Sequence, residues 1–230
     1  MGKIELQVPA SLEAITLRQY QKYIKVADQN KGEEYAEFLN KKLVEIFCNV
    51  NLNEVESIPI VEFEKVLGIL QKAFDEKQKL QLHFTLGGKE FGFIPKLDDM
   101  SLGEYIDVES SIGDWQNIHK AMAVLYRPVN FKQKDKYTIA PYKPNDELKE
   151  WMREMPMNVV MGAMVFFYDL GMELSRASLS YLEREMKKAK TSRLKALLAK
   201  NGDGINQFMD SLKETSQNLT KLHLNHYTSV

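Results

Sequence analysis

This sequence has little that points to disulfide bonds, secretion or a membrane. Its 230 residues include one cysteine, Cys48, which excludes a disulfide framework and leaves no cysteine cluster to hold zinc. The N-terminus lacks the apolar run of a signal peptide, and nowhere do about 18 uncharged apolar residues follow one another. We therefore expect a soluble protein of a reducing compartment, without a membrane partner.

The sequence also lacks an excess of charge of one sign. It has 31 Lys and Arg against 32 Asp and Glu, so binding of nucleic acid would need a local basic patch. Apolar residues make up 44% of the chain, which is enough for a buried core and excludes wholesale disorder.

No catalytic motif is present. The glycines at 87–88 and 202–204 lack the spacing of a P-loop or a dinucleotide-binding fingerprint, and nucleophile-elbow, zincin and kinase patterns are absent. One acidic stretch has enough carboxylates to bind a divalent cation, but it lacks the alternation of a calcium loop: Asp98, Asp99, Glu104, Asp107, Glu109 and Asp114. We interpret it as helix capping and a solvated face, and predict no catalytic residue, metal or cofactor.

The first third is predicted to be a strand followed by a helical unit, over residues 1–78. Apolar and polar residues alternate over 3–8 and stop at Pro9, which predicts a short edge strand. Thr16 is a candidate N-cap, Gly32 separates its helix from a second at about 33–48, and Pro59 starts a third.

The middle of the chain, residues 79–200, is predicted to be a β-hairpin with a helical core. Two alternating runs flank Gly87-Gly88, which predicts the hairpin. Ser101 and Glu104 have the spacing of a capping box, and Asp114 is the predicted cap of the next helix. Lysines and prolines over 129–145 predict a long surface loop with at most one strand.

The most apolar segment, residues 156–172, is predicted to be a buried central helix. A charged helix follows to about Lys200, where Asn201-Gly202-Asp203-Gly204 is expected to break it. Residues 201–230 then form an amphipathic polar tail. Together the patterns predict a mostly α-helical α+β protein, whose first two parts pack as one compact body.

Two segments are candidates for contacts with macromolecules. Apolar residues of the tail recur at helical spacing, and would bind a partner's groove or fold back on the chain itself: Ile205, Phe208, Met209, Leu212, Leu219 and Leu222. The second candidate is a basic face: Arg184, Lys187, Lys188, Lys190, Arg193 and Lys195. No aromatic residues interleave with these charges to stack on bases, so a solvated face is preferred over nucleic-acid binding.

Several strings resemble small assembly proteins encoded among the virion genes of tailed bacteriophages. They lie in fragments between residues 5 and 172: 8–12 (VPASL), 15–20 (ITLRQY), 43–48 (LVEIFC), 91–95 (FGFIP), 102–107 (LGEYID), 119–128 (HKAMAVLYRP) and 162–168 (GAMVFFY). The resemblance implies a tail assembly chaperone or hub-assembly factor that binds other tail or virion proteins in the host cytoplasm during infection. It brings no catalytic residues.

Other functions stay open at this point. The first alternative is a permanent virion component at a neck, ring or baseplate position, and the chain is also compatible with a homo-oligomer. The second is a nucleic-acid-binding regulator acting through 184–200, or an enzyme of an unfamiliar kind.

Overall fold

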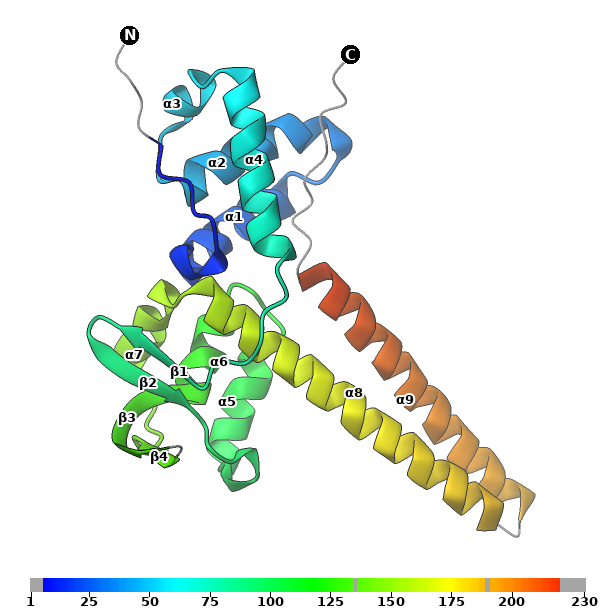
Figure 1. Ribbon diagram of the computed structural model, residues 1–230. Coiled ribbons are helices and arrows are strands. Elements are labelled where there is room, and N and C mark those ends of the chain that lie inside the picture. Colours follow the sequence, from blue (N-terminus) through cyan, green and yellow to red (C-terminus); the bar gives the residue numbers. More distant parts are fainter. Residues whose placement is uncertain (1–5, 135, 189–190, 220–230) are drawn as a thin grey trace.

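The structure is a computed structural model that describes residues 6–134, 136–188 and 191–219. Helices from the first third form one end of a body, a four-stranded sheet with its flanking helices forms the other, and a long helical hairpin projects from it (Figure 1). The α-helices are α1 (Leu17–Gln29), α2 (Ala36–Phe47), α3 (Leu52–Glu56), α4 (Ile60–Asp75), α5 (Leu102–Ile112), α6 (Ile118–Leu125), α7 (Asp146–Trp151), α8 (Met157–Lys188) and α9 (Ser192–Leu219). The strands and 3-10 helices are β1 (His83–Leu86), β2 (Lys89–Phe93), β3 (Tyr126–Gln133), β4 (Lys136–Ile139), η1 (Leu12–Ala14), η2 (Glu33–Tyr35), η3 (Leu97–Asp99) and η4 (Met152–Glu154). The prediction of a mostly helical α+β protein is confirmed.

Helix α1 starts at the predicted cap and ends before the predicted glycine break. The Thr16 hydroxyl accepts the backbone N–H of Gln19 at 3.2 Å, and the Gln19 side chain accepts the Thr16 N–H at 2.9 Å. This capping box satisfies two donors that the start of α1 leaves free. Gly32, at φ 141°, separates α1 from η2 and α2.

The predicted N-terminal strand is wrong. Residues 3–5 lie outside the described part of the chain, and residues 6–10 belong to no strand. Leu6 and Val8 nevertheless pack against the core, beside Ile58 and Val66. The alternation therefore reflects an extended segment that packs alternate side chains on helices without pairing in a sheet.

The predicted hairpin is confirmed as β1 and β2, but the sheet extends further than predicted. Gly87 and Gly88 have φ of 53° and 76°, as a two-residue turn requires. β3 and β4 then continue the antiparallel sheet in the order β1-β2-β3-β4. β4 is the one strand that the prediction allowed over 129–145, whereas the loop predicted before it is wrong, because β3 extends to Gln133. The Pro128 carbonyl accepts the Ala140 N–H at 2.9 Å, one residue past the end of β4. The N–H that proline lacks is therefore missing at the end of the β3–β4 ladder and not in its middle. The lysines that favoured a loop lie instead at the edge of the sheet, where charged side chains stay in water.

The capping box of α5 is confirmed, whereas the cap predicted for α6 is displaced. The Glu104 carboxylate accepts the Ser101 N–H at 2.7 Å, and the Ser101 hydroxyl accepts the Glu104 N–H at 3.3 Å. Asp114 accepts the Gln116 N–H at 2.9 Å, but α6 begins only after Asn117. Asp114 thus caps the turn that precedes the helix.

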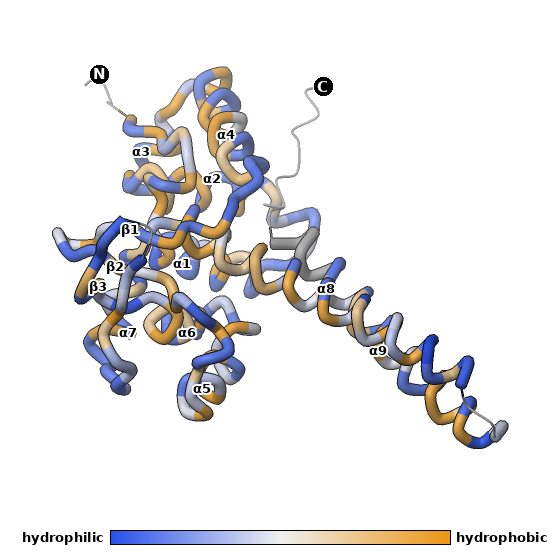
Figure 2. Tube along the Cα trace, turned by 60° about the horizontal axis from the view of Figure 1, so that its bottom comes forward, coloured by the Kyte–Doolittle hydropathy of each residue, from blue (hydrophilic) through white to orange (hydrophobic). Residues whose placement is uncertain are grey.

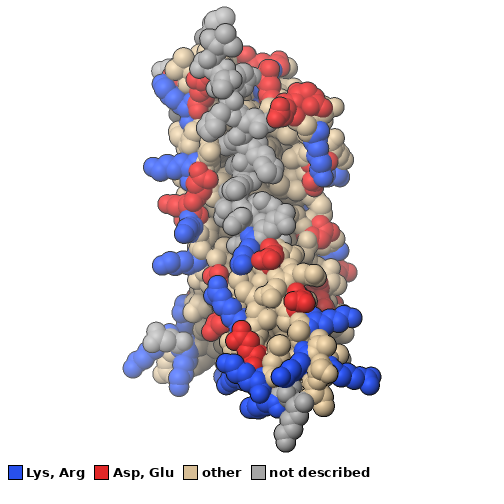
Figure 3. Space-filling model, turned by 90° about the vertical axis from the view of Figure 1, so that its right-hand side faces the viewer, with Lys and Arg blue, Asp and Glu red and all other residues tan. Residues whose placement is uncertain are grey.

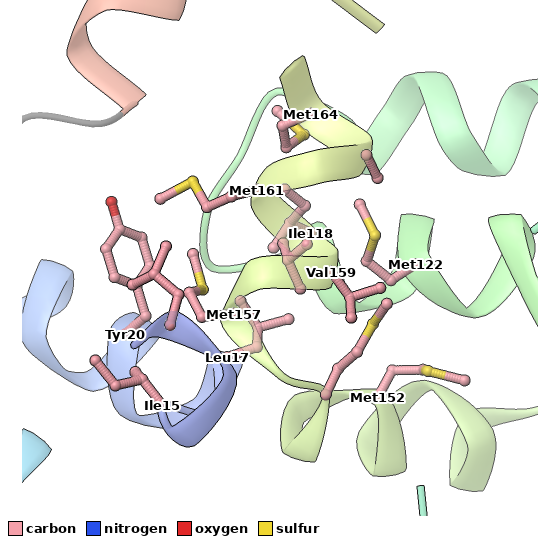
Figure 4. Packing of buried hydrophobic residues seen from close by; sticks show 14 of the residues in the cluster. Ile15, Leu17, Tyr20, Ile118, Met122, Met152, Met157, Val159, Met161 and Met164 are labelled. Carbon is pink, nitrogen blue, oxygen red and sulfur yellow. The ribbon is translucent and has the colours of Figure 1, made fainter. Parts of the chain in front are cut away.

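The core between the N-terminal helices and α8 is rich in methionine. Figure 4 shows Met152 and Met157 among the branched and aromatic side chains of this cluster, and both are fully buried. The methionine side chain is unbranched and flexible, so it fills irregular gaps between packed helices. Two backbone hydrogen bonds cross the same place: Leu17 N–H to Met155 O at 2.9 Å and Met157 N–H to Ile15 O at 2.8 Å. The start of α8 is thereby tied to the entry of α1.

The helix breaks predicted near the C-terminus are wrong. α8 begins after Pro156 as expected, but it continues through Gly171 to Lys188. α9 runs through residues 201–204, so the predicted polar tail is helical as far as Leu219. A glycine costs a helix only about 1 kcal/mol relative to alanine, and packing between two long helices offsets that cost. Leu179 of α8 lies 3.8 Å from the position that a Cβ of Gly202 would take, so this glycine lies against α8.

Within the described chain, α8 is the one helix long and apolar enough to cross a membrane. Of its most apolar 18-residue window, 39% is buried inside the protein. The buried residues lie between Met157 and Met164 and belong to the core. Packing in the core thus accounts for the apolar character of Met157–Met164. These residues belong to the central helix predicted over 156–172.

Candidate protein-binding surface

An apolar cleft opens where α5 faces the base of the α8–α9 hairpin. Its volume is about 800 Å³, and its walls come from η3, α5, α8 and α9. Among the described residues that line it, Glu109 is the one with a charge; the others are Gly113 and the apolar side chains Leu97, Met100, Leu102, Tyr105, Val108, Ile112, Met164, Phe167, Tyr168, Leu170 and Phe208. A cleft of this composition is suited to an apolar segment of another molecule.

The α5 wall carries apolar residues on both sides of its helix. Val108 is buried in the core, whereas Leu102 is 75% exposed and Tyr105 and Ile106 are about half exposed. Leu102, Tyr105 and Ile106 follow one another at spacings of three and one residues, so they share the outer side of α5. Large apolar side chains gathered beside a cleft are typical of a surface that another protein covers.

The hairpin also leaves large apolar side chains in solvent. Figure 2 shows hydrophobic and hydrophilic residues interspersed along both α8 and α9 as they leave the body. The contact between the two helices covers only part of the hydrophobic ones; five stay more than two-fifths exposed: Leu174, Tyr181, Leu194, Leu197 and Phe208. The hairpin therefore has more large apolar side chains than the contact between its two helices covers.

The structure places five of the six predicted partner-binding residues on α9, between Ile205 and Leu219. Phe208 is 54% exposed and lines the cleft, whereas Ile205 and Met209 are half-buried. Leu212 and Leu219 are residues of α9, and Leu222 lies outside the described residues. The prediction thus located one wall of the cleft, through Phe208, but not the cleft.

The opposite walls were missed. Met164, Phe167 and Tyr168 lie in the segment 156–172, for which a buried helix is predicted, and Tyr105 directly follows the predicted capping box of Ser101 and Glu104. The sequence contains one usable signal: α5 has apolar residues on more than one side, which a helix that packs on a single neighbour does not need. These segments line one cleft only because α9 folds back along α8. The helix break predicted at 201–204 did not allow for a continuous α9.

The predicted basic face lies at the far end of the hairpin. Figure 3 shows Lys and Arg gathered at the lower end of the molecule, which is the tip of α8 and α9. Five of its residues are exposed there, and Lys190 lies outside the described residues: Arg184, Lys187, Lys188, Arg193 and Lys195. Lys188 pairs with Glu185 at 2.8 Å, an exposed contact worth a fraction of a kcal/mol. The tip stays strongly positive.

A buried ion pair holds α5 against β3 behind the cleft. Arg127 Nη2 lies 2.8 Å from Glu104 Oε1, and both side chains are about nine-tenths buried. Burial raises the pKa of Glu104, but the hydrogen bonds from Ser101 and the charge of Arg127 outweigh it and hold the pKa below its usual range. Tyr142 donates a hydrogen bond to Asp107 one turn further along α5. These carboxylates of the acidic stretch therefore fix the position of α5.

A second polar cluster joins α1, α6 and α7. Gln21 Nε2 lies 3.2 Å from His119 Nδ1, and Gln21 Oε1 accepts a hydrogen bond from Arg153 at 2.7 Å. Glu150 Oε1 lies 3.5 Å from His119 Nε2. Burial, with the charge of Arg153, lowers the pKa of His119 to about 4, so the ring is neutral at pH 7. The cluster holds helices together, and no nucleophile adjoins the histidine in the described contacts.

Cys48, the one cysteine of the sequence, lies at the end of α2. Burial raises the pKa of its thiol to about 11, so it stays protonated and packs as a small apolar side chain. In the described part of the chain no group of three or more His, Cys, Asp or Glu residues is placed to hold a metal ion.

Comparisons with known proteins give no relative: no family model, no curated protein and no solved structure matches this chain.

Proposed function

We propose that this chain is a non-enzymatic morphogenesis protein of a tailed bacteriophage, acting as a tail assembly chaperone or hub-assembly factor. The observation that carries the proposal is the open apolar cleft between α5 and the hairpin. The resemblance of fragments between residues 5 and 172 to phage assembly proteins supplies the biological setting.

In this proposal the cleft holds an apolar segment of an unassembled tail protein. Phe167 from α8 and Phe208 from α9 offer aromatic faces, and Leu102 and Tyr105 of α5 close the opposite side. An amphipathic helix of the tail protein would bury its apolar side there. Burial of apolar surface is the favourable term in such a contact, at about 2.5 kcal/mol for each 100 Å² removed from water. Polymerisation of the tail protein would then displace the segment from the cleft.

Genetic complementation tests the proposal. The gene is inactivated in the phage that encodes the chain, and plasmid-borne variants are scored for tailed particles by electron microscopy. We expect tail-less heads without the protein and normal tails with the wild type. Normal tails without any functional copy would overturn the proposed function.

Two substitutions in α9 separate the cleft from the rest of the helix. Phe208→Asp places a charge in the cleft, and Asn206→Asp places the same charge on an exposed position that does not line it. We expect Asn206→Asp to restore tails and Phe208→Asp to leave them absent, with both proteins folded by circular dichroism. Full activity of Phe208→Asp would exclude the cleft as the binding surface.

A further inference from the structure

The hairpin ends in a positively charged tip that also carries exposed leucines. Between 184 and 200 the described residues include six basic side chains and one carboxylate, Glu185. We call this region the basic tip: Arg184, Lys187, Lys188, Arg193, Lys195 and Lys200. Leu194 and Leu197 are about half exposed and border a hollow of about 510 Å³ that Arg193 and Lys200 also line. The basic tip thus has exposed apolar side chains at its centre and positive charges around them.

The outer side of α5 has the opposite charge and a similar apolar centre. Residues 97–119 contain no Lys or Arg, and four of their carboxylates are exposed. We call this region the acidic face: Asp98, Asp99, Glu109 and Asp114 with Leu102, Tyr105 and Ile106. Lys96 approaches Asp99 only to 3.9 Å, with both side chains about three-quarters exposed, so this pair leaves most of the negative charge uncompensated.

One molecule cannot bring these two surfaces together. Met164 of α8 lies beside α5 in the cleft, and Lys188 is 24 residues further along the same helix. At the rise of an α-helix this separation is about 36 Å, and the hairpin points away from the body (Figure 1). Contact between the basic tip and the acidic face therefore requires two molecules.

We infer that the chain associates with itself head to tail, the basic tip of one copy binding the acidic face of the next. Apolar centres with rims of opposite charge have the composition of a specific protein interface. The contact is heterologous, so it closes into a ring or continues as a filament. It covers Leu102 and Tyr105, so a neighbouring copy and a tail protein would compete for that wall of the cleft. The inference goes beyond the proposed function, because it holds for the purified chain whatever the chain assembles.

Two sets of charge reversals at exposed positions test the inference by sedimentation equilibrium. The tip variant carries Lys187→Glu, Lys188→Glu and Arg193→Glu, and the face variant carries Asp98→Lys, Asp99→Lys and Glu109→Lys. A control carries the same change in net charge as the tip variant on three exposed lysines of the body, Lys22→Glu, Lys25→Glu and Lys77→Glu. Circular dichroism of all three establishes that they fold.

The wild type and the control should associate at about 0.05 M salt, with a dissociation constant that rises at least about tenfold at about 0.5 M salt. Each variant alone should be monomeric. An equimolar mixture of the two variants should associate again, because the intact tip of the face variant binds the intact face of the tip variant, and the reversed tip and the reversed face also have opposite charges.

Three results would overturn the inference. A wild type that stays monomeric at low salt would exclude self-association, and binding of a labelled DNA duplex that requires the tip would then assign the tip to nucleic acid. Variants that associate like the wild type would place the contact elsewhere. A mixture that stays monomeric, when each variant alone is monomeric, would exclude the head-to-tail arrangement.

Discussion

At the scale of single residues, the position of α8 depends on Gly162. A Cβ built at this glycine would lie 2.2 Å from the backbone oxygen of Lys79 and 2.8 Å from its carbonyl carbon. No side chain can move aside there, because both atoms belong to the backbone that leads into β1. The glycine therefore lets the core helix approach the segment before β1 closely.

Gly162→Ala should lower the free energy of unfolding by about 1–3 kcal/mol, although alanine favours the helix. Gly68→Ala is the matched control, since Gly68 is also in a helix and has no atom within 4 Å of a Cβ. That substitution should raise the free energy of unfolding by up to about 1 kcal/mol. Urea denaturation measures both, and equal effects of the two substitutions would contradict the close approach.

His119 gives the fold a dependence on pH. Its pKa falls from 6.5 in the unfolded chain to about 4 in the folded protein, so below pH 6.5 the unfolded chain binds the proton first. The free energy of unfolding that this group contributes is complete above pH 6.5 and is lost as the pH falls towards 4. The side chain is 1% exposed, and the loss should amount to about 1–3 kcal/mol.

Urea denaturation of the wild type and of His119→Gln at pH 7, 5 and 4 measures this loss. Glutamine removes the titrating ring and keeps an oxygen that can accept from Gln21. The difference in stability between the two proteins should shrink as the pH falls from 7 to 4. A difference that stays constant over this range would show that His119 titrates normally in the folded protein.

At the scale of elements, helix starts and turns were predictable from the sequence where they depend on residues close together in the chain. The Thr16 and Ser101 capping boxes, the Gly87-Gly88 turn and the start of α8 after Pro156 all depend on residues within a few positions. The predictions failed where a distant partner decides. Pro128 is in a strand because β2 and β4 flank it, and Gly202 is in a helix that packs on α8.

The continuity of α9 can be tested at Gly204, which has no atom within 4 Å of a Cβ. Gly204→Pro should disrupt the middle of α9, because proline costs a helix interior about 3 kcal/mol or more, whereas Gly204→Ala should strengthen it. Hydrogen exchange across 192–219 should accelerate at least tenfold in the proline variant and slow in the alanine variant. Equal exchange in both would mean that the helix is already broken at 201–204.

At the scale of the whole molecule, the candidate surface became visible only when the chain folded back. The sequence indicated the apolar residues of α9 and the basic residues around 184–195, but not that Phe208 lines the same cleft as Met164 and Phe167. A formal charge of −1 likewise hides the separation between a basic tip and an acidic face. Both features depend on the relative positions of segments that lie 40 or more residues apart, which local periodicity does not contain.

Quantitative mass spectrometry of purified particles beside the infected-cell lysate tests the assembly role most directly. The account predicts that the chain is abundant in the lysate while tails are being built and absent from finished particles. A fixed, stoichiometric amount in every particle would contradict a transient assembly factor and identify a permanent component. Absence from the infection altogether would contradict the phage setting.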